Sequence, residues 1–194
     1  MHYLITGTGR CGTLYAAKYL QAKGLDVQHE KYGCEGTVDW WLTCSWELVP
    51  TPVFDQIVHI YREPLATISS LTTCPLDHEI WSHIIRNSPV HEDDPLLLRC
   101  MKHWHYWNLM GEGLADLSLR IEDWSLATIG SFFGLSGEEP DIPKDTHTWK
   151  GNFQPRTWEE LYELEPELTR LIRKQARRYG YSYDEAYFDR RQHF

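Results

Sequence analysis

The fold is predicted by one stretch near the start of the sequence, Tyr3-Leu4-Ile5-Thr6-Gly7-Thr8-Gly9-Arg10-Cys11-Gly12-Thr13-Leu14. It begins with an apolar run of strand length and continues into a glycine-rich turn. The segment that follows, which ends at Gly24, has apolar residues on one helical face. A strand, a glycine-rich loop and a helix in this order form an anion site, because the loop N–H groups and the helix N-terminus carry partial positive charge.

The loop differs from the ordinary phosphate-binding loop in the position of its cation. That loop has the pattern Gly-x-x-x-x-Gly-Lys-[Ser/Thr]. Gly7 and Gly12 have the required spacing, but Thr13 follows Gly12 directly and the lysine is missing. Arg10 is the only cation in this loop. We therefore expect an anionic group to be held by the loop backbone, the Arg10 guanidinium and the Thr13 hydroxyl.

A second motif with the same chemistry follows a later strand. The apolar run Gln56–Tyr61 predicts a strand that is covered on both faces. Arg62-Glu63-Pro64 comes next, and proline favours the first position of a helix. Ser70 would then lie about two turns into that helix, where its hydroxyl and the Arg62 guanidinium can converge on an anion. In parallel sheets, ligands bind beyond the carboxyl ends of strands, so the two motifs predict a ligand with two anionic groups.

Strands alternate with helices along the rest of the chain. Residues 25–29 and 117–121 read as strands, and 25–29 is expected to lie next to the first strand. Helices are expected over 78–86, 95–110, 122–133 and from Pro166 to about Gly180. The tryptophan-rich segment 37–48 is also expected to be helical and to contribute mainly to the core. This alternation predicts one α/β domain over residues 1–194, with three layers and a mostly parallel sheet.

Composition limits the classes of function. Lys and Arg total 19 against 28 Asp and Glu, a formal net charge of −9, which argues against a nucleic-acid partner. The five cysteines include no C-x-x-C pair, which favours a reducing compartment. The early first strand leaves no room for a signal peptide, and no apolar run is long enough to cross a bilayer. We expect a cytoplasmic protein without a membrane span and without a metal site, since His103 and His105 do not face one point on a helix.

The two motifs together resemble those of the PAPS-dependent sulfotransferases (PAPS is 3′-phosphoadenosine 5′-phosphosulfate). The first motif of that family, G-x-x-[R/K]-x-G-T, is similar to Gly7–Thr13, although Cys11 stands where serine is common. Its second motif, R-[D/N]-P with a later serine, is similar to Arg62-Glu63-Pro64 with Ser70, although Glu63 replaces Asp or Asn. A Lys-Gly pair in the family's carboxyl-terminal loop resembles Lys150-Gly151. The resemblance implies a P-loop nucleotide-hydrolase-like fold of the sulfotransferase type.

The resemblance also implies a reaction and its residues. A sulfuryl group would pass in line, without a metal, from PAPS to a hydroxyl or amine of a small-molecule, glycan or peptide acceptor, leaving 3′,5′-ADP. Arg10 would neutralise charge on the leaving group, and Glu30, or secondly His29, would accept the proton of the acceptor. The cofactor would be held by Gly9, Arg10, Cys11, Gly12, Thr13, Leu14, Arg62, Ser70, Lys150 and Gly151. The oligomeric state is not indicated by the sequence.

Other interpretations of the same residues stay open. A small-molecule or nucleotide kinase would need a loop lysine and magnesium ligands. A non-catalytic nucleotide-binding module would keep the loop and lack the base. Each motif also has a structural explanation: an ordinary strand-to-helix turn, a surface arginine, a solvated loop at residues 29–30 and a surface lysine at position 150.

Overall fold

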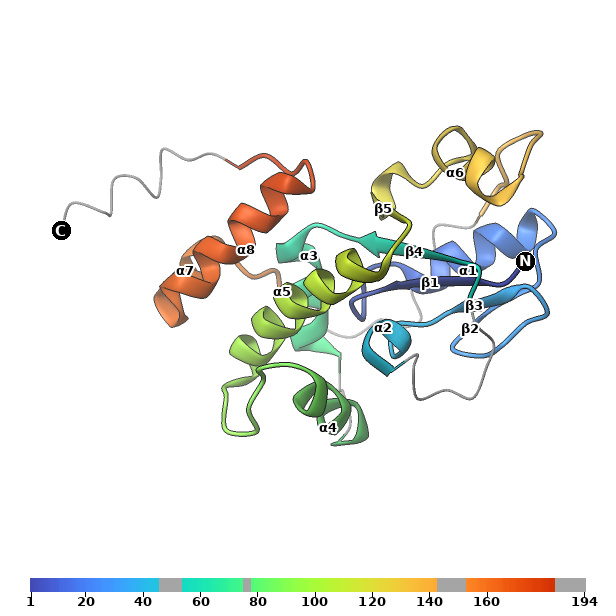
Figure 1. Cartoon of the computed structure of the whole chain (residues 1–194). Coiled ribbons are helices and arrows are strands. Elements are labelled where there is room, and N and C mark those ends of the chain that lie inside the picture. The colour runs from blue at the N-terminus through green and yellow to red at the C-terminus, as the bar shows by residue number, and fades with distance from the viewer. Residues whose placement is uncertain (46–53, 75–77, 143–152, 184–194) are drawn as a thin grey trace.

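The chain folds around a sheet of five parallel strands (Figure 1). The computed structural model describes residues 1–45, 54–74, 78–142 and 153–183. The strand order is β2-β3-β1-β4-β5. The strands are β1 (Tyr3–Gly7), β2 (Val27–His29), β3 (Gly36–Val38), β4 (Gln56–Tyr61) and β5 (Leu117–Arg120). The α/β class and the parallel sheet predicted from the sequence are confirmed.

Helices cover both faces of this sheet. On β4, Val58 and Ile60 pack in one core with residues of α1 and α6, whereas Tyr61 belongs to a second core with α3, α5 and α8. Because successive strand residues point to opposite faces, the two cores lie on opposite sides of the sheet. The helices are α1 (Thr13–Ala22), α2 (Leu42–Ser45), α3 (Pro64–Thr73), α4 (His78–Asn87), α5 (Leu96–Leu114), α6 (Leu126–Phe133), α7 (Trp158–Leu164) and α8 (Pro166–Arg178), with a 3-10 turn, η2, at Ile121–Asp123.

The pairing of β1 with β4 brings the two predicted motifs together. Gly7 lies opposite Ile60 in this pair, so the loop after β1 and Arg62 after β4 leave the sheet at the same edge. A Cβ atom on Gly7 would lie 2.1 Å from the carbonyl oxygen of Ile60, which only glycine avoids. The predicted shared edge of the two motifs is confirmed.

The sequence-based prediction for residues 25–48 is wrong in two respects. First, β2 does not lie next to β1, because β3 lies between them. Second, β3 occupies Gly36–Val38, so the predicted helix is reduced to α2 within the part of this segment that is described. A three-residue strand is too short to show a two-residue period in the sequence. Trp40 does lie in the core, as predicted.

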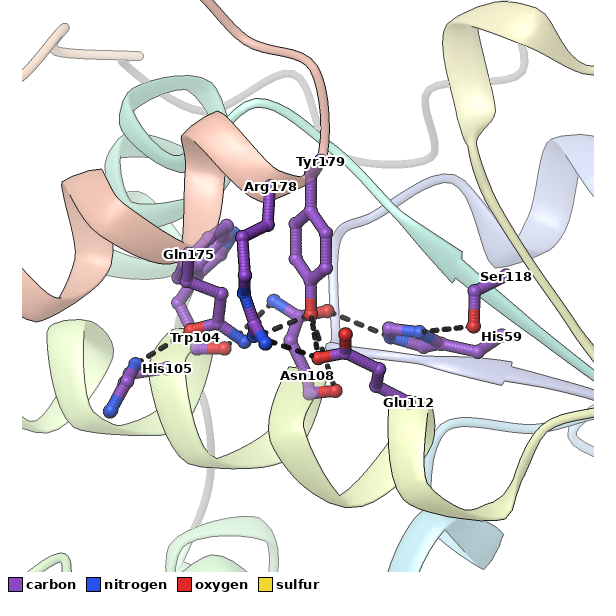
Figure 2. A network of polar contacts seen from close by, with 9 residues as sticks. All are labelled: His59, Trp104, His105, Asn108, Glu112, Ser118, Gln175, Arg178 and Tyr179. Carbon is purple, nitrogen blue, oxygen red and sulfur yellow. Dashed lines mark hydrogen bonds and ion pairs between the residues drawn. The ribbon is translucent and has the colours of Figure 1, made fainter.

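A network of buried polar side chains fixes α8 to α5 and to the sheet (Figure 2). Asn108 of α5 is at its centre: its Oδ1 accepts a hydrogen bond from His59 Nε2 (3.0 Å) and its backbone oxygen accepts one from the Tyr179 hydroxyl (3.4 Å). Gln175 of α8 pairs with His105 Nδ1 at 2.6 Å and donates to the Tyr179 hydroxyl at 2.9 Å. These buried groups are therefore satisfied by partners from distant parts of the chain.

The burial of His59 predicts a loss of stability in acid. Burial lowers the pKa of His59 from its ordinary 6.5 to about 4, although the hydrogen bond with Asn108 opposes this shift. The contribution of neutral His59 to the free energy of unfolding is therefore complete above pH 6.5. It is lost as the pH falls toward 4, by up to about 1.4 kcal/mol per pH unit, because the unfolded chain binds the proton first. Denaturant unfolding between pH 7 and 4 should show a shallower decline in His59→Gln than in the wild type.

The exposed His78 supplies the control for this experiment. The variant His78→Gln should keep the pH dependence of the wild type. Equal slopes for His59→Gln and the wild type would contradict the assignment of this acid sensitivity to His59.

Candidate functional site

The loop after β1 is a tight turn that opens directly into α1. The Cys11 N–H donates to the Thr8 carbonyl (3.2 Å), and Arg10 and Gly12 have left-handed backbone with φ of 70° and 105°. Gly12 is the N-cap of α1, and no hydrogen bond from a described side chain caps this helix. By contrast, the Glu63 carboxylate caps α3 by accepting from the Ala66 N–H at 2.6 Å. The N-terminus of α1 therefore keeps N–H groups for an anion.

A cavity of about 440 Å³ lies against this loop. Its volume is in the range of small-molecule sites, about 300–1,000 Å³. One part of its wall is polar and contains Arg10, Thr13, His29, Glu30 and Arg62, next to the backbone of Gly9 and Gly12. The other part is largely apolar and contains Leu14, Tyr15, Trp40, Leu71, Ile80 and Ile84. The lining of the cavity thus combines two arginines with a group of apolar side chains.

The two motifs contact each other through Arg10. Arg10 Nε donates to the Ser70 hydroxyl at 3.0 Å, and Arg62 Nη1 donates to the Arg10 carbonyl at 3.5 Å. The two arginines therefore line the same cavity. Ser70, which was expected to share an anion with Arg62, contacts Arg10 instead and is not among the lining residues.

The two departures from the family motifs have structural explanations. Cys11 is completely buried beneath the loop, and burial raises the pKa of its thiol to about 12. Cys11 therefore packs under the loop and does not line the cavity, where the resemblance had placed it among the cofactor contacts. Glu63 caps α3 with one carboxylate oxygen and accepts a hydrogen bond from the Tyr183 hydroxyl with the other, at 2.9 Å.

The two residues expected to act as base, His29 and Glu30, both line the cavity but differ in their surroundings. His29 Nε2 lies 3.0 Å from the Thr13 hydroxyl, and burial lowers the pKa of the imidazole while the charge of Glu30 opposes this shift. A glutamate base needs burial to work near neutral pH, yet the Glu30 side chain is 47% exposed. By contrast, burial raises the pKa of the Asp39 carboxyl, which interacts electrostatically with Glu30, to about 6.

The backbone is strained at two positions of this wall. Within the described ranges, the two non-glycine residues with positive φ are Arg10 and Glu30, at 70° and 54°. Such conformations cost about 1–3 kcal/mol each and concentrate at functional sites. Both residues line the cavity, so the strain coincides with the predicted site.

Sequence reasoning missed the apolar wall of the cavity and one buried histidine in it. His103 of α5 lines the cavity together with Trp40. The sequence favours a core role for Trp40 over a place in an acceptor pocket, and it brings in His103 only as a candidate metal ligand. Apart from Trp40, the apolar lining residues come from α1, α3 and α4, and His103 comes from α5. Because these helices are far apart in the chain, no local motif could have predicted that they share a cavity. Lys150 and Gly151 lie outside the described residues.

Among the residues that the structure describes, no group of three or more His, Cys, Asp or Glu side chains could hold a metal ion. None of the described helices combines the length and hydrophobicity that a membrane span requires. Comparison with protein-family models, with curated proteins and with solved structures gives no match.

The loop geometry predicts a specific need for glycine at position 12. A Cβ atom on Gly12 would lie 2.7 Å from Ile121 Cγ1, in addition to the strain of its positive φ. Gly24 also has positive φ, of 90°, but open space around it. In denaturant unfolding, Gly24→Ala should cost about 1–2 kcal/mol and Gly12→Ala about 1–3 kcal/mol more.

The double variant Gly12→Ala/Ile121→Ala separates the strain of the positive φ from the clash with Ile121. Measured against Ile121→Ala alone, the added alanine should cost less unfolding free energy than it does in the wild type, because the clashing side chain is shortened. Equal costs for Gly12→Ala and Gly24→Ala would contradict the close packing of the loop on Ile121.

Proposed function

We propose that the protein is a PAPS-dependent sulfotransferase with the P-loop-like fold of that family. One observation carries the proposal: a single cavity joins the uncapped N-terminus of α1 with the side chains of Arg10 and Arg62. Two guanidinium groups and a glycine-rich loop suit a ligand with two separate anionic groups. PAPS has a 5′-phosphosulfate and a 3′-phosphate, which meets this requirement.

The geometry supports a division of roles between the two arginines. The loop backbone and Thr13 would hold the 5′-phosphosulfate, and Arg62 would hold the 3′-phosphate. Ser70 accepts from Arg10 Nε at 3.0 Å, so in this proposal it orients the Arg10 guanidinium and directs the terminal nitrogens toward the ligand. Arg10 would then neutralise the charge that develops on the leaving group.

The proposed reaction also needs a base for the acceptor. Glu30 and His29 line the cavity, and both stay proposed for this role. His29 also contacts Thr13, since its Nε2 lies 3.0 Å from the Thr13 hydroxyl. The proton-accepting step would therefore take place at the polar wall, beside the loop.

The 3′-phosphate site is tested by thermal shift. The product 3′,5′-ADP should raise the melting temperature of the protein well above the rise produced by ADP at the same concentration, because only the former has a 3′-phosphate. Arg62→Ala should abolish this difference, whereas Lys18→Ala, which removes an exposed charge from α1, should preserve it. Equal shifts with the two nucleotides would favour a general nucleotide-binding module and overturn the proposal.

The role of Arg10 is tested by variants that accept its left-handed backbone. Arg10→Gly and Arg10→Asn both tolerate a φ of 70°, so they remove the guanidinium without adding strain. Sulfuryl transfer from radiolabelled PAPS to a panel of phenols, alcohols, amines and sugars should fall about 10²–10³-fold in both variants. An unchanged rate would exclude Arg10 from the reaction.

A further inference from the structure

His103 is a buried imidazole without a hydrogen-bond partner at the cavity. It is 0% exposed, it lines the cavity, and neither of its ring nitrogens has a hydrogen-bond partner within the described ranges. His105, two residues along the same helix, is also buried but pairs with Gln175 at 2.6 Å. Because unpaired buried polar groups are costly and uncommon, the state of His103 calls for an explanation.

The position of the His103 ring is fixed by aromatic packing. Its ring centroid lies 5.8 Å from that of Trp40 and 4.7 Å from that of Trp107. Its Nε2 lies 3.7 Å from where a Cβ atom on Gly9 would be. The imidazole is therefore held beside the loop after β1, close to Gly9.

The surroundings of His103 limit which ligand groups could hydrogen-bond to its ring. Burial lowers the pKa of His103 to about 3, so the ring is neutral at physiological pH and offers one N–H donor and one acceptor nitrogen. A hydroxyl both donates and accepts, so it can pair with either nitrogen. The side chains of Leu71 and Ile84 in the same wall offer no polar partner, so a sugar would leave further hydroxyls unsatisfied there.

We propose that the apolar side chains of the cavity lining bind a small aromatic or aliphatic alcohol whose hydroxyl hydrogen-bonds to His103. The binding site is argued from the cavity alone, whereas its identity as the acceptor site rests on the proposed function. In that case the hydroxyl oxygen forms a bond to the sulfur of PAPS, the bond from sulfur to the phosphate oxygen breaks, and the hydroxyl proton passes to the base. The proposal selects small alcohols and phenols among the acceptors considered from the sequence.

The proposal is tested by calorimetric titration of the full chain, without nucleotide, with two molecules that differ by one hydroxyl. The protein should bind 4-methylphenol about 5- to 10-fold more tightly than toluene, the difference expected for one hydrogen bond. His103→Leu should abolish this preference, His103→Gln should retain part of it, and His105→Leu should leave it unchanged. Methyl glucoside should bind less tightly than 4-methylphenol.

Thermal unfolding of the same variants provides an independent readout. His103→Leu should raise the melting temperature of the free protein, because it removes two unpaired nitrogens from a buried position. His105→Leu should lower it, because Gln175 loses its partner. A binding difference between these variants can therefore be separated from a failure to fold.

Three results would overturn the proposal: equal affinities for 4-methylphenol and toluene, a preference that persists in His103→Leu, or tighter binding of methyl glucoside. Failure of the proposed function gives a different pattern. In that case 4-methylphenol binds with the expected dependence on His103, but PAPS transfers no sulfuryl group to it. Transfer that occurs without dependence on His103 would leave the enzyme assignment in place and remove the alcohol site.

Discussion

The close pairing of β1 with β4 is the constraint on which the site depends. Gly7 faces Ile60 across this pair, and a side chain on Gly7 would come within 2.1 Å of the Ile60 carbonyl oxygen. The absence of that side chain lets the loop after β1 emerge beside Arg62. The hydrogen bond from Arg10 to Ser70 and the contact of Arg62 with the Arg10 carbonyl both follow from this arrangement. Without the register of these two strands, the two cations would not line the same cavity.

Satisfied polar groups and strained backbone positions are found at different places in the chain. Side chains cap α3 and α7, and the network around Asn108 provides partners for His59, Gln175 and Tyr179. At the cavity, α1 has no side-chain cap, and Arg10 and Glu30 have strained backbone. Features that cost free energy at one place are retained when they prepare a binding site. This localisation of strain supports a binding role for the cavity independently of any resemblance in sequence.

Several elements could be predicted because their signals are local. The apolar run of β1, the glycines of the loop and Pro64 at the start of α3 each act within a few residues. The strand β3 could not be predicted, because three residues show no period and its pairing depends on Tyr3 of β1. Because β3 lies between β2 and β1, His29 at the end of β2 is one strand further from β1 than predicted. His29 nevertheless reaches the Thr13 hydroxyl, because α1 packs across β2 and β3.

The sequence by itself determined the α/β class, the glycine-rich loop between a strand and a helix, and the presence of Arg10 and Arg62 after two strands. The tertiary structure decided which groups meet: Ser70 contacts Arg10, Glu30 is exposed, and His103 lies beside Gly9 in the wall of the cavity. The physical reason is the range of the interactions. Periodicity, turns and helix starts depend on neighbours in the chain, whereas burial and hydrogen-bond partners depend on residues brought together by strand pairing and helix packing.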